Sequence, residues 1–339
     1  TGGTTGVSKG AMLSHRNMVY NVQQTITWQG DVYDDIDQVI AITALPLYHI
    51  FSLEGNCLTV MALGGQNVLI TNPRDFEGFA KEIAQFRFNL FTGVNTMFAS
   101  LMHTPSFSKI DFSYLRVSIG GGMAVQPAVA KEWKEKTGQT ILQGYGLTET
   151  SPVAICCKVG SEFDGSIGLP VPSTDVMIAN DDGAALPIGE IGEICIKGPQ
   201  VMEGYWQRPE ATAEVMLPGG WLRTGDVGRM DEGGYVWIED RKKDMILVSG
   251  FNVYPNEIEN VVVEIDGILE AAAIGVADEK SGEIVKIFAV RTTDSVTEQD
   301  ILDYCRENLT GYKRPKIVEF RDELPKTNVG KILRRALRD

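Results

Sequence analysis

In the first half of the chain, short apolar runs alternate with segments of helical spacing, and this alternation constrains the fold more than any other feature. Helical spacing marks 75–85 and 126–137. Runs with the length and composition of buried strands occupy 39–45 (VIAITAL), 67–70 (NVLI), 115–121 (LRVSIGG) and 140–146 (TILQGYG). An alternation of this kind predicts a doubly wound, mostly parallel sheet covered by helices. Ligands bind such sheets at the carboxyl ends of the strands.

The pattern changes twice further along the chain. Frequent Gly and Pro with short alternating runs, such as GEICIKG and GYVWIED, predict a small antiparallel β unit. After the charged run at 239–244, strands alternate with the helical segments 255–265 and 297–309. We therefore expect an α/β protein with a large domain at 1–240, divided into an α/β part (1–162) and a β-rich part (163–240). A small α+β domain is expected at 241–339.

Composition excludes several classes of function. The net charge of −14 argues against nucleic-acid binding, which needs a basic surface, but a small anion needs only local basic groups. The five cysteines show no CxxC spacing and are expected to be free thiols in a reducing compartment. With three histidines and no HExxH motif, the sequence does not favour a zinc site. In 39–63 a strand followed by a buried helix is expected, because Pro46, His49 and Glu54 interrupt any apolar span.

The first ten residues, TGGTTGVSKG, have the composition of a phosphate-binding loop. Glycines at positions 2, 3 and 6 let backbone N–H groups turn towards an anion, and Lys9 adds a full charge. Hydroxyl donors come from Thr1, Thr4, Thr5 and Ser8. The Walker spacing fails, because Lys9 lies three residues after Gly6 rather than directly after it, and GxGxxG is absent. A flexible Gly/Thr linker is the alternative.

Three further motifs each have a functional and a structural interpretation. In QGYGLTET (143–150), Tyr145 can lie on a flat base and Glu149 offers oxygen ligands of the kind Mg²⁺ prefers. In GWLRTGDVG (220–228), Asp226 can accept the hydroxyls of a ribose. PKTNVGKILRR (325–335) places Lys331 after a turn. The structural alternatives are a solvated turn for the first two motifs and a solvated basic face for the third and for the charged run DRKKD.

In their order along the chain, TGGTTGVSKG, GYGLTET, TGD, DRKKDMI and PKTNVGKILRR resemble the adenylate-forming superfamily of acyl-CoA synthetases, luciferases and adenylation domains. Segments such as PLYHIF, FTGVNTMF, SIGLPVPSTD and LTGYKRPK resemble those of bacterial long-chain fatty acid–CoA ligases. The resemblance covers essentially the whole chain. It implies that ATP and a fatty acid form an acyl-adenylate and pyrophosphate, and that coenzyme A then takes the acyl group and releases AMP. ATP, Mg²⁺ and coenzyme A are the implied cofactors and co-substrate.

The resemblance also implies roles for individual residues. Lys331 would bridge the acyl carboxylate and the α-phosphate, Thr148 would contact the phosphate, and Glu149 would hold Mg²⁺ with help from Thr1. Tyr145, between Gly144 and Gly146, would stack on adenine beside a wall formed by Gly120, Gly121 and Gly122. Asp226 and Arg241 would hold the ribose. The phosphate grip would comprise Thr1, Gly2, Gly3, Thr4, Thr5, Gly6 and Lys9.

Further implied roles concern the acyl pocket, the hinge and coenzyme A. His49, Phe51, Gly93 and Val94 would line the acyl pocket, although core packing is the alternative for the neighbouring Phe91 and Phe98. Lys243 would be the hinge about which the small domain rotates between the half-reactions. Coenzyme A would meet Ser249, Gly250 and Phe251.

Members of this superfamily carry a further α/β lobe ahead of the loop, so we expect a fragment with a truncated large domain. Such a fragment is expected to be weakly active or inactive alone. Peripheral contact with the inner face of a membrane, a cytoplasmic location and a homodimer are further expectations. Two other functions stay open: an acid-adenylating relative that passes its acyl group to another acceptor, and a non-catalytic nucleotide- or acyl-binding module.

Overall fold

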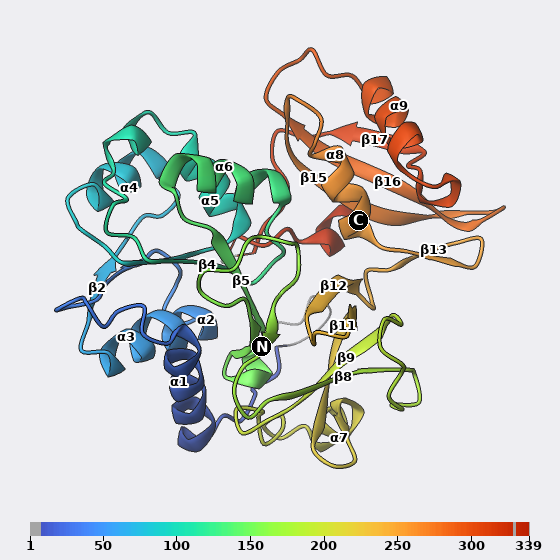
Figure 1. Ribbon diagram of the computed structural model, residues 1–339. Helices are drawn as coiled ribbons and strands as arrows, with labels where there is room; N and C mark the ends of the chain where they lie inside the picture. The colour runs from blue at the N-terminus through green and yellow to red at the C-terminus, as the bar shows by residue number, and fades with distance from the viewer. Residues whose placement is uncertain (1–7, 328–329, 339) are drawn as a thin grey trace. The chain divides into compact units, whose positions relative to one another are not determined.

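The computed structural model describes residues 8–327 and 330–338. Their contacts divide the chain into two units. The first comprises the described residues up to Thr224 together with Arg229–Trp237, and the second comprises Gly225–Gly228 with the described residues from Ile238 onwards. Each unit is considered by itself (Figure 1).

The first unit contains a seven-stranded sheet of order β2-β1-β3-β4-β5-β6-β7. The strands from β2 to β5 in that order are parallel, whereas β6 and β7 are antiparallel additions at one edge. Their bounds are β1 (Ile40–Thr43), β2 (Gln66–Leu69), β3 (Leu90–Gly93), β4 (Val117–Gly121), β5 (Ile141–Gly146), β6 (Val153–Cys156) and β7 (Leu169–Pro170). The mostly parallel sheet and its four expected strands are confirmed. Strand β3, which lies between β1 and β4, was not predicted from the sequence.

Helices accompany these strands in the order that the sequence pattern predicts. The expected helices at 75–85 and 126–137 are α4 (Phe76–Ile83) and α6 (Pro127–Thr137). Local signals set their ends, because Asp75 caps α4 and Gly138 ends α6 in a left-handed conformation. The buried helix expected after β1 is a run of α2 (Ile50–Ser52), the π-helix η1 (Leu53–Leu58) and α3 (Thr59–Ala62). Two unpredicted helices are α1 (His15–Gln29) and α5 (Asn95–Met102).

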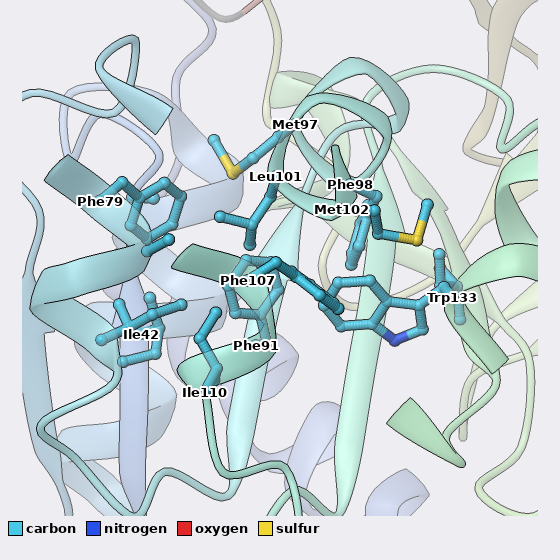
Figure 2. Packing of buried hydrophobic residues seen from close by; sticks show 14 of the residues in the cluster. Ile42, Phe79, Phe91, Met97, Phe98, Leu101, Met102, Phe107, Ile110 and Trp133 are labelled. Atoms are coloured by element: carbon cyan, nitrogen blue, oxygen red, sulfur yellow. The ribbon is translucent and has the colours of Figure 1, made fainter. Parts of the chain in front are cut away.

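An aromatic core joins α4, α5 and α6 to the sheet (Figure 2). The ring centroids of Phe91 and Phe98 lie 5.4 Å apart, and those of Phe98 and Trp133 lie 4.8 Å apart in an edge-to-face arrangement. Trp133 satisfies its indole N–H by donating to Ser118 Oγ at 3.1 Å. Core packing, the alternative considered for Phe91 and Phe98, is therefore confirmed, since both are fully buried in this cluster.

The β-rich part forms a second sheet of order β10-β11-β9-β8, with β12 paired to β11. The pairs β8–β9 and β10–β11 are antiparallel, as expected for a small antiparallel unit. The elements are β8 (Asp175–Ala179), β9 (Gly192–Lys197), α7 (Pro209–Val215), β10 (Met216–Leu217), β11 (Trp221–Met230) and β12 (Val236–Arg241).

The second unit has an α+β fold. Its sheet has the strand order β14-β13-β16-β15, and β17 pairs with β16 in parallel. Its elements are β13 (Ile246–Val248), β14 (Phe251–Val253), α8 (Pro255–Val262), β15 (Ile268–Asp278), β16 (Gly282–Arg291), α9 (Glu298–Asn308) and β17 (Ile317–Phe320). Alternate residues of β15 face opposite ways: Ala271 and Ala273 pack with α8 and α9. Ala272 and Ile274 pack instead with side chains from the C-terminal segment.

Among the described residues, no helix combines the length and the apolar character that crossing a membrane requires.

Candidate functional site

The end of β5 carries the predicted adenine and magnesium residues. Tyr145 is buried opposite Ile155 of β6, and Glu149 lies on the 3-10 turn Thr148–Thr150 that follows the strand. A Cβ atom on Gly146 would lie 1.7 Å from the carbonyl oxygen of Pro152. Only glycine therefore lets the strand pass this close to the returning chain, and that contact fixes where Glu149 emerges.

Glu149 is held by a residue that the sequence analysis missed. The Tyr205 hydroxyl donates to Glu149 Oε1 at 2.7 Å, and the Met202 N–H donates to the Glu149 carbonyl at 2.8 Å. Burial is the largest cause that raises the pKa of Tyr205, and the hydrogen bond to Glu149 raises it further. The hydroxyl therefore keeps its proton. Lys9 Nζ lies 4.9 Å from the centre of the same ring. Tyr205 thus connects the two motifs predicted to contact phosphate and metal.

Helix α1 fixes these segments with a buried polar face. Asn21 donates to the Val153 carbonyl at 2.7 Å and accepts from the Val153 N–H at 2.9 Å. Asn17 donates to the carbonyls of Pro199 and Val201. Satisfied amides of this kind are worth little net energy individually but are costly to break, so they specify one arrangement of the chain around Glu149.

The predicted glycine wall and acyl pocket meet at one contact. Gly120 and Gly121 end β4 and Gly122 directly follows it, and a Cβ on Gly121 would lie 3.0 Å from the ring of Phe51. Phe51 is oriented by His49, whose Nδ1 accepts its backbone N–H at 3.3 Å. The other two pocket residues, Gly93 and Val94, border the aromatic core: Val94 is buried within it, and a Cβ on Gly93 would lie 3.1 Å from Phe98.

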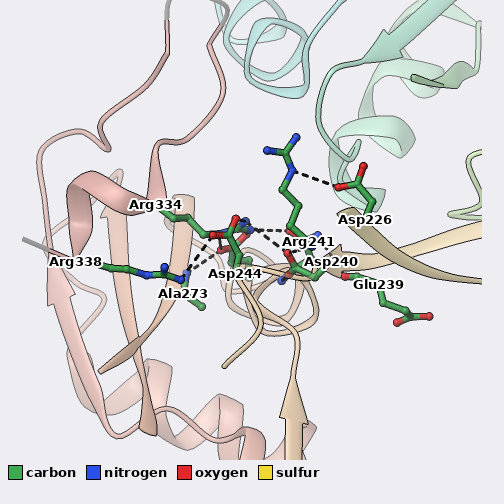
Figure 3. A network of polar contacts seen from close by, with 10 residues as sticks. Asp226, Glu239, Asp240, Arg241, Asp244, Ala273, Arg334 and Arg338 are labelled. Atoms are coloured by element: carbon green, nitrogen blue, oxygen red, sulfur yellow. Dashed lines mark hydrogen bonds and ion pairs between the residues drawn. The ribbon is translucent and has the colours of Figure 1, made fainter. Parts of the chain in front are cut away.

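In the second unit, Asp226 and Arg241 lie together on β11 and β12 (Figure 3). Arg241 Nε is 3.4 Å from Asp226 Oδ1, and Asp226 is only 6% exposed. Lys331 is electrostatically coupled to this pair. The pKa of Lys331 is lowered to about 8, chiefly by burial and also by the positive charge of Arg241, while the charge of Asp226 opposes this shift. Asp226, Arg241 and Lys331 therefore form one local group.

Arg334 is the centre of a buried charge network that the sequence did not predict (Figure 3). Its guanidinium donates to both oxygens of Glu259, at 2.9 and 2.8 Å, and to Asn256 Oδ1 at 2.7 Å. Asp244 Oδ2 and Asp240 Oδ1 lie 3.5 and 3.7 Å away. The solvated basic face considered for this motif is wrong for Arg334, because its side chain is only 15% exposed.

The predicted hinge residue and two of the three predicted coenzyme A residues lie in turns of the second unit. Lys243 is exposed in the segment between β12 and β13. Ser249 and Gly250, with φ of 51° and 83°, form the turn between β13 and β14. Phe251 follows them and stacks on Tyr312 with a centroid distance of 4.6 Å, while remaining 54% exposed.

Part of the predicted site lies outside the described residues, namely Thr1, Gly2, Gly3, Thr4, Thr5 and Gly6. Within residues 8–327 and 330–338, no three His, Cys, Asp or Glu side chains gather as a metal site. Glu149 is a single carboxylate, of the type through which Mg²⁺ is held together with phosphate oxygens.

Comparison with known proteins places this architecture in a family. The profile of AMP-binding enzymes matches residues 1–206, and that of the AMP-binding enzyme C-terminal domain matches 257–331. The chain belongs to the AMP-binding enzyme family, the adenylate-forming superfamily that the motifs indicate.

Among its relatives are long-chain-fatty-acid–CoA ligases. The chain is 57% identical to that of Escherichia coli O6:H1, over 100% of this chain and 60% of the relative. It is 41% identical to that of Bacillus subtilis, over 99% of this chain and 60% of the relative. The chain thus spans about 60% of the length of these curated relatives.

The fold matches solved structures throughout. ATP-bound MatB from Rhodopseudomonas palustris superposes with a TM-score of 0.91 at 33% identity, covering 99% of this chain and 66% of that one. The anthranilate CoA ligase AuaEII in complex with anthranoyl-AMP gives 0.90 at 30% identity, covering 100% and 66%. The predicted fold class is confirmed by these matches.

Proposed function

We propose that this chain carries the ATP-dependent activation of a long-chain fatty acid to its adenylate, followed by transfer of the acyl group to coenzyme A. The observation that carries the proposal is the 57% identity to a long-chain-fatty-acid–CoA ligase over the whole chain. Because the chain spans 60% of that relative, the activity of the whole enzyme is a proposal for this chain. The contacts of Glu149 with Tyr205, and of Asp226 with Arg241, support it.

In the first unit, ATP would lie at the carboxyl end of the sheet, where open α/β sheets bind ligands. The ring of Tyr145 would take the adenine, and Lys9 and Thr148 would contact the phosphates. Glu149 would hold Mg²⁺, and Thr1 would supply a further oxygen ligand to the same ion. When bound, Mg²⁺ neutralises part of the charge on the phosphate oxygens.

In the second unit, Lys331 would offset the repulsion between the acyl carboxylate and the α-phosphate. A lysine suits this role because it is a compact charge on a long stem. With a pKa of about 8, Lys331 is mostly charged at neutral pH, as the role requires. Asp226 and Arg241 would hold the ribose, and Phe251 with Ser249 and Gly250 would meet coenzyme A.

Lys243 is proposed as the hinge residue, near the boundary proposed at 240/241. Its segment lies where the contacts of the chain divide, since Ile238 begins the main part of the second unit. Lys243→Pro restricts φ and removes an N–H donor, so it should impair one half-reaction and spare the other. Pyrophosphate exchange and thioester formation, measured separately, test this. Equal loss of both would contradict a hinge.

Ligand binding by the full chain tests the central proposal. Isothermal titration would compare ATP with non-hydrolysable acyl-adenylate analogues carrying a palmitoyl or an acetyl group. Each buried methylene adds about 0.8 kcal/mol, so the palmitoyl analogue should bind at least about a hundredfold more tightly. Equal affinities would refute a long-chain acyl site.

Product analysis separates the alternatives. For the full-length protein supplied with ATP, Mg²⁺, palmitate and coenzyme A, mass spectrometry should detect palmitoyl-CoA and AMP. Palmitoyl-adenylate without the thioester would favour a relative that passes its acyl group to another acceptor. Binding of ATP with neither product would favour a nucleotide-binding module. Peripheral membrane contact, a cytoplasmic location and a homodimer stay predictions.

A further inference from the structure

We propose that Tyr205 is a positioning residue that joins Lys9 and the segment directly after it to the carboxylate of Glu149. The proposal rests on the proposed function, since it assigns Tyr205 a role in presenting that carboxylate to a metal–ATP complex. It concerns the first unit alone, and it uses three separate contacts made by the backbone, the hydroxyl and the ring of one residue.

The backbone of Tyr205 holds the segment that leaves the loop. Ala11 and Tyr205 form an antiparallel bridge. On either side of it, the Trp206 N–H donates to the Gly10 carbonyl at 2.7 Å and the Met12 N–H donates to the Gly204 carbonyl at 2.8 Å. These bonds place the residues directly after Lys9 beside Tyr205. The position of Lys9 is therefore set by a segment far from it in sequence.

The hydroxyl of Tyr205 orients the carboxylate of Glu149. Its bond to Oε1 is buried and 2.7 Å long, which is the length of a strong bond to a charged acceptor. A carboxylate that accepts one hydrogen bond from a fixed donor cannot rotate freely. The direction of its remaining lone pairs is therefore set before a ligand arrives. Ordering of this kind lowers the entropic cost of binding a metal ion.

The ring of Tyr205 supports Lys9. Its centroid lies 4.9 Å from Lys9 Nζ, within the range of an attractive cation–π contact. Tyr205 as a residue is buried, with an exposed fraction of 8%, and its backbone N–H donates to Thr212 Oγ1 at 2.8 Å. The platform under the lysine is thus rigid. A phosphate contacted by Lys9 and a metal held by Glu149 would both depend on this one side chain.

Two substitutions separate the contacts. Tyr205→Phe deletes the hydroxyl and keeps the ring, so it should loosen Glu149 and leave Lys9 supported. Tyr205→Leu removes both. Tyr114→Phe is the matched control, because Tyr114 is a partly exposed tyrosine whose ring also lies beneath a cation, Arg87, at 4.9 Å.

Two affinities are measured. The first is the affinity of the full chain for ATP in EDTA. The second is the affinity of the ATP-bound chain for Mn²⁺, which is monitored by electron paramagnetic resonance. For Tyr205→Phe we expect Mn²⁺ affinity to fall about tenfold or more, the effect of losing a hydrogen bond to a charged group. ATP affinity in EDTA should stay at the wild-type value, and the thermal midpoint should fall only by the modest amount that the loss of one hydrogen bond costs. For Tyr205→Leu both affinities should fall, and Tyr114→Phe should match the wild type.

Unchanged Mn²⁺ affinity in Tyr205→Phe would overturn the proposal. So would a parallel loss of both affinities with a lowered thermal midpoint, because that pattern marks a purely structural tyrosine. Failure of the proposed function gives a different result: the wild-type chain would then bind no ATP under either condition, and the assignment of Tyr205 would fall with it.

Discussion

Replacing Arg334 with Met tests the buried charge network of the second unit. The substitution keeps most of the side-chain volume and removes the charge. It leaves Asp240, Asp244 and Glu259 facing one another, with side-chain exposures of 0%, 12% and 11%. Removing one partner of a buried ion pair costs about 3–5 kcal/mol, because the remaining charge is buried without compensation.

Two features of the network place the expected loss near the lower end of that range. Arg338 lies 3.7 Å from Asp244 and can compensate part of its charge. Asp240 also accepts backbone N–H bonds from Arg241 at 2.6 Å and Asn256 at 2.7 Å, which persist in the variant. We therefore expect Arg334→Met to lower the free energy of unfolding of the second unit by about 3 kcal/mol at pH 7.

The pH dependence of this loss identifies its cause. Burial raises the pKa of Asp240 to about 6, and the charge of Arg334 opposes that rise. A group whose pKa is higher in the folded state binds more protons there, so its contribution to stability is lost as pH rises through the folded pKa. Without Arg334 the folded pKa of Asp240 rises further. The deficit of Arg334→Met should thus be small near pH 4 and grow towards pH 7.

Urea unfolding at several pH values, with hydrogen exchange to assign the loss to the second unit, is the assay. Arg335→Met is the control, since Arg335 is the exposed neighbour and should change stability by less than about 0.5 kcal/mol. Arg334→Lys should recover only part of the loss, because an ammonium cannot reproduce the paired bonds to Glu259. A deficit below about 0.5 kcal/mol at pH 7, or one independent of pH, would refute the reasoning.

Three further predictions concern Lys331, Glu54 and Gly146. Adenylation by the chain should fall as pH rises through about 8, where Lys331 loses its proton, and Lys331→Arg should move that limb to higher pH; a pH profile of pyrophosphate exchange checks both. Burial raises the pKa of Glu54 to about 8, so ionisation favours the unfolded state between about pH 4.5 and 8, and Glu54→Gln should be more stable than wild type by a margin that grows across this window; urea unfolding would contradict this if the margin stayed constant. Gly146→Ala should cost at least about 1–3 kcal/mol and weaken ATP binding, because the new Cβ would overlap the Pro152 carbonyl; thermal unfolding and titration with ATP measure the two effects.

Two of the elements that were not predicted from the sequence, β3 and α1, differ from the predicted ones in a physical way. Strand β3 is four residues, Leu90–Gly93, and only Val94 separates it from α5. Its apolar run therefore continues into a helix without a turn signal. Helix α1 buries Asn17, Asn21 and Gln24, so the face that packs inward is polar and an apolar period cannot reveal it.

The site residues also divide into those that the sequence could predict and those that it could not. Glycine-rich motifs could be read from the sequence because a close approach such as Gly146 to Pro152 restricts a single position to one residue type. Tyr205 and Arg334 could not be found in this way. Their partners lie 56 and 75 residues away, at Glu149 and Glu259, and nothing local distinguishes a paired tyrosine or arginine from a solvated one.

The contacts of the C-terminal segment also restrict how Lys331 could move. Leu324, Ile332 and Leu337 pack on one face of β15 and β16, so apolar contacts hold the chain on both sides of the lysine. Arg334 adds an ionic anchor to α8, and Lys326 adds another to Glu270 at 2.8 Å. Releasing Lys331 as a free loop would break all of these at once. These contacts agree with the proposed hinge at Lys243, in which Lys331 would move together with the elements that hold it.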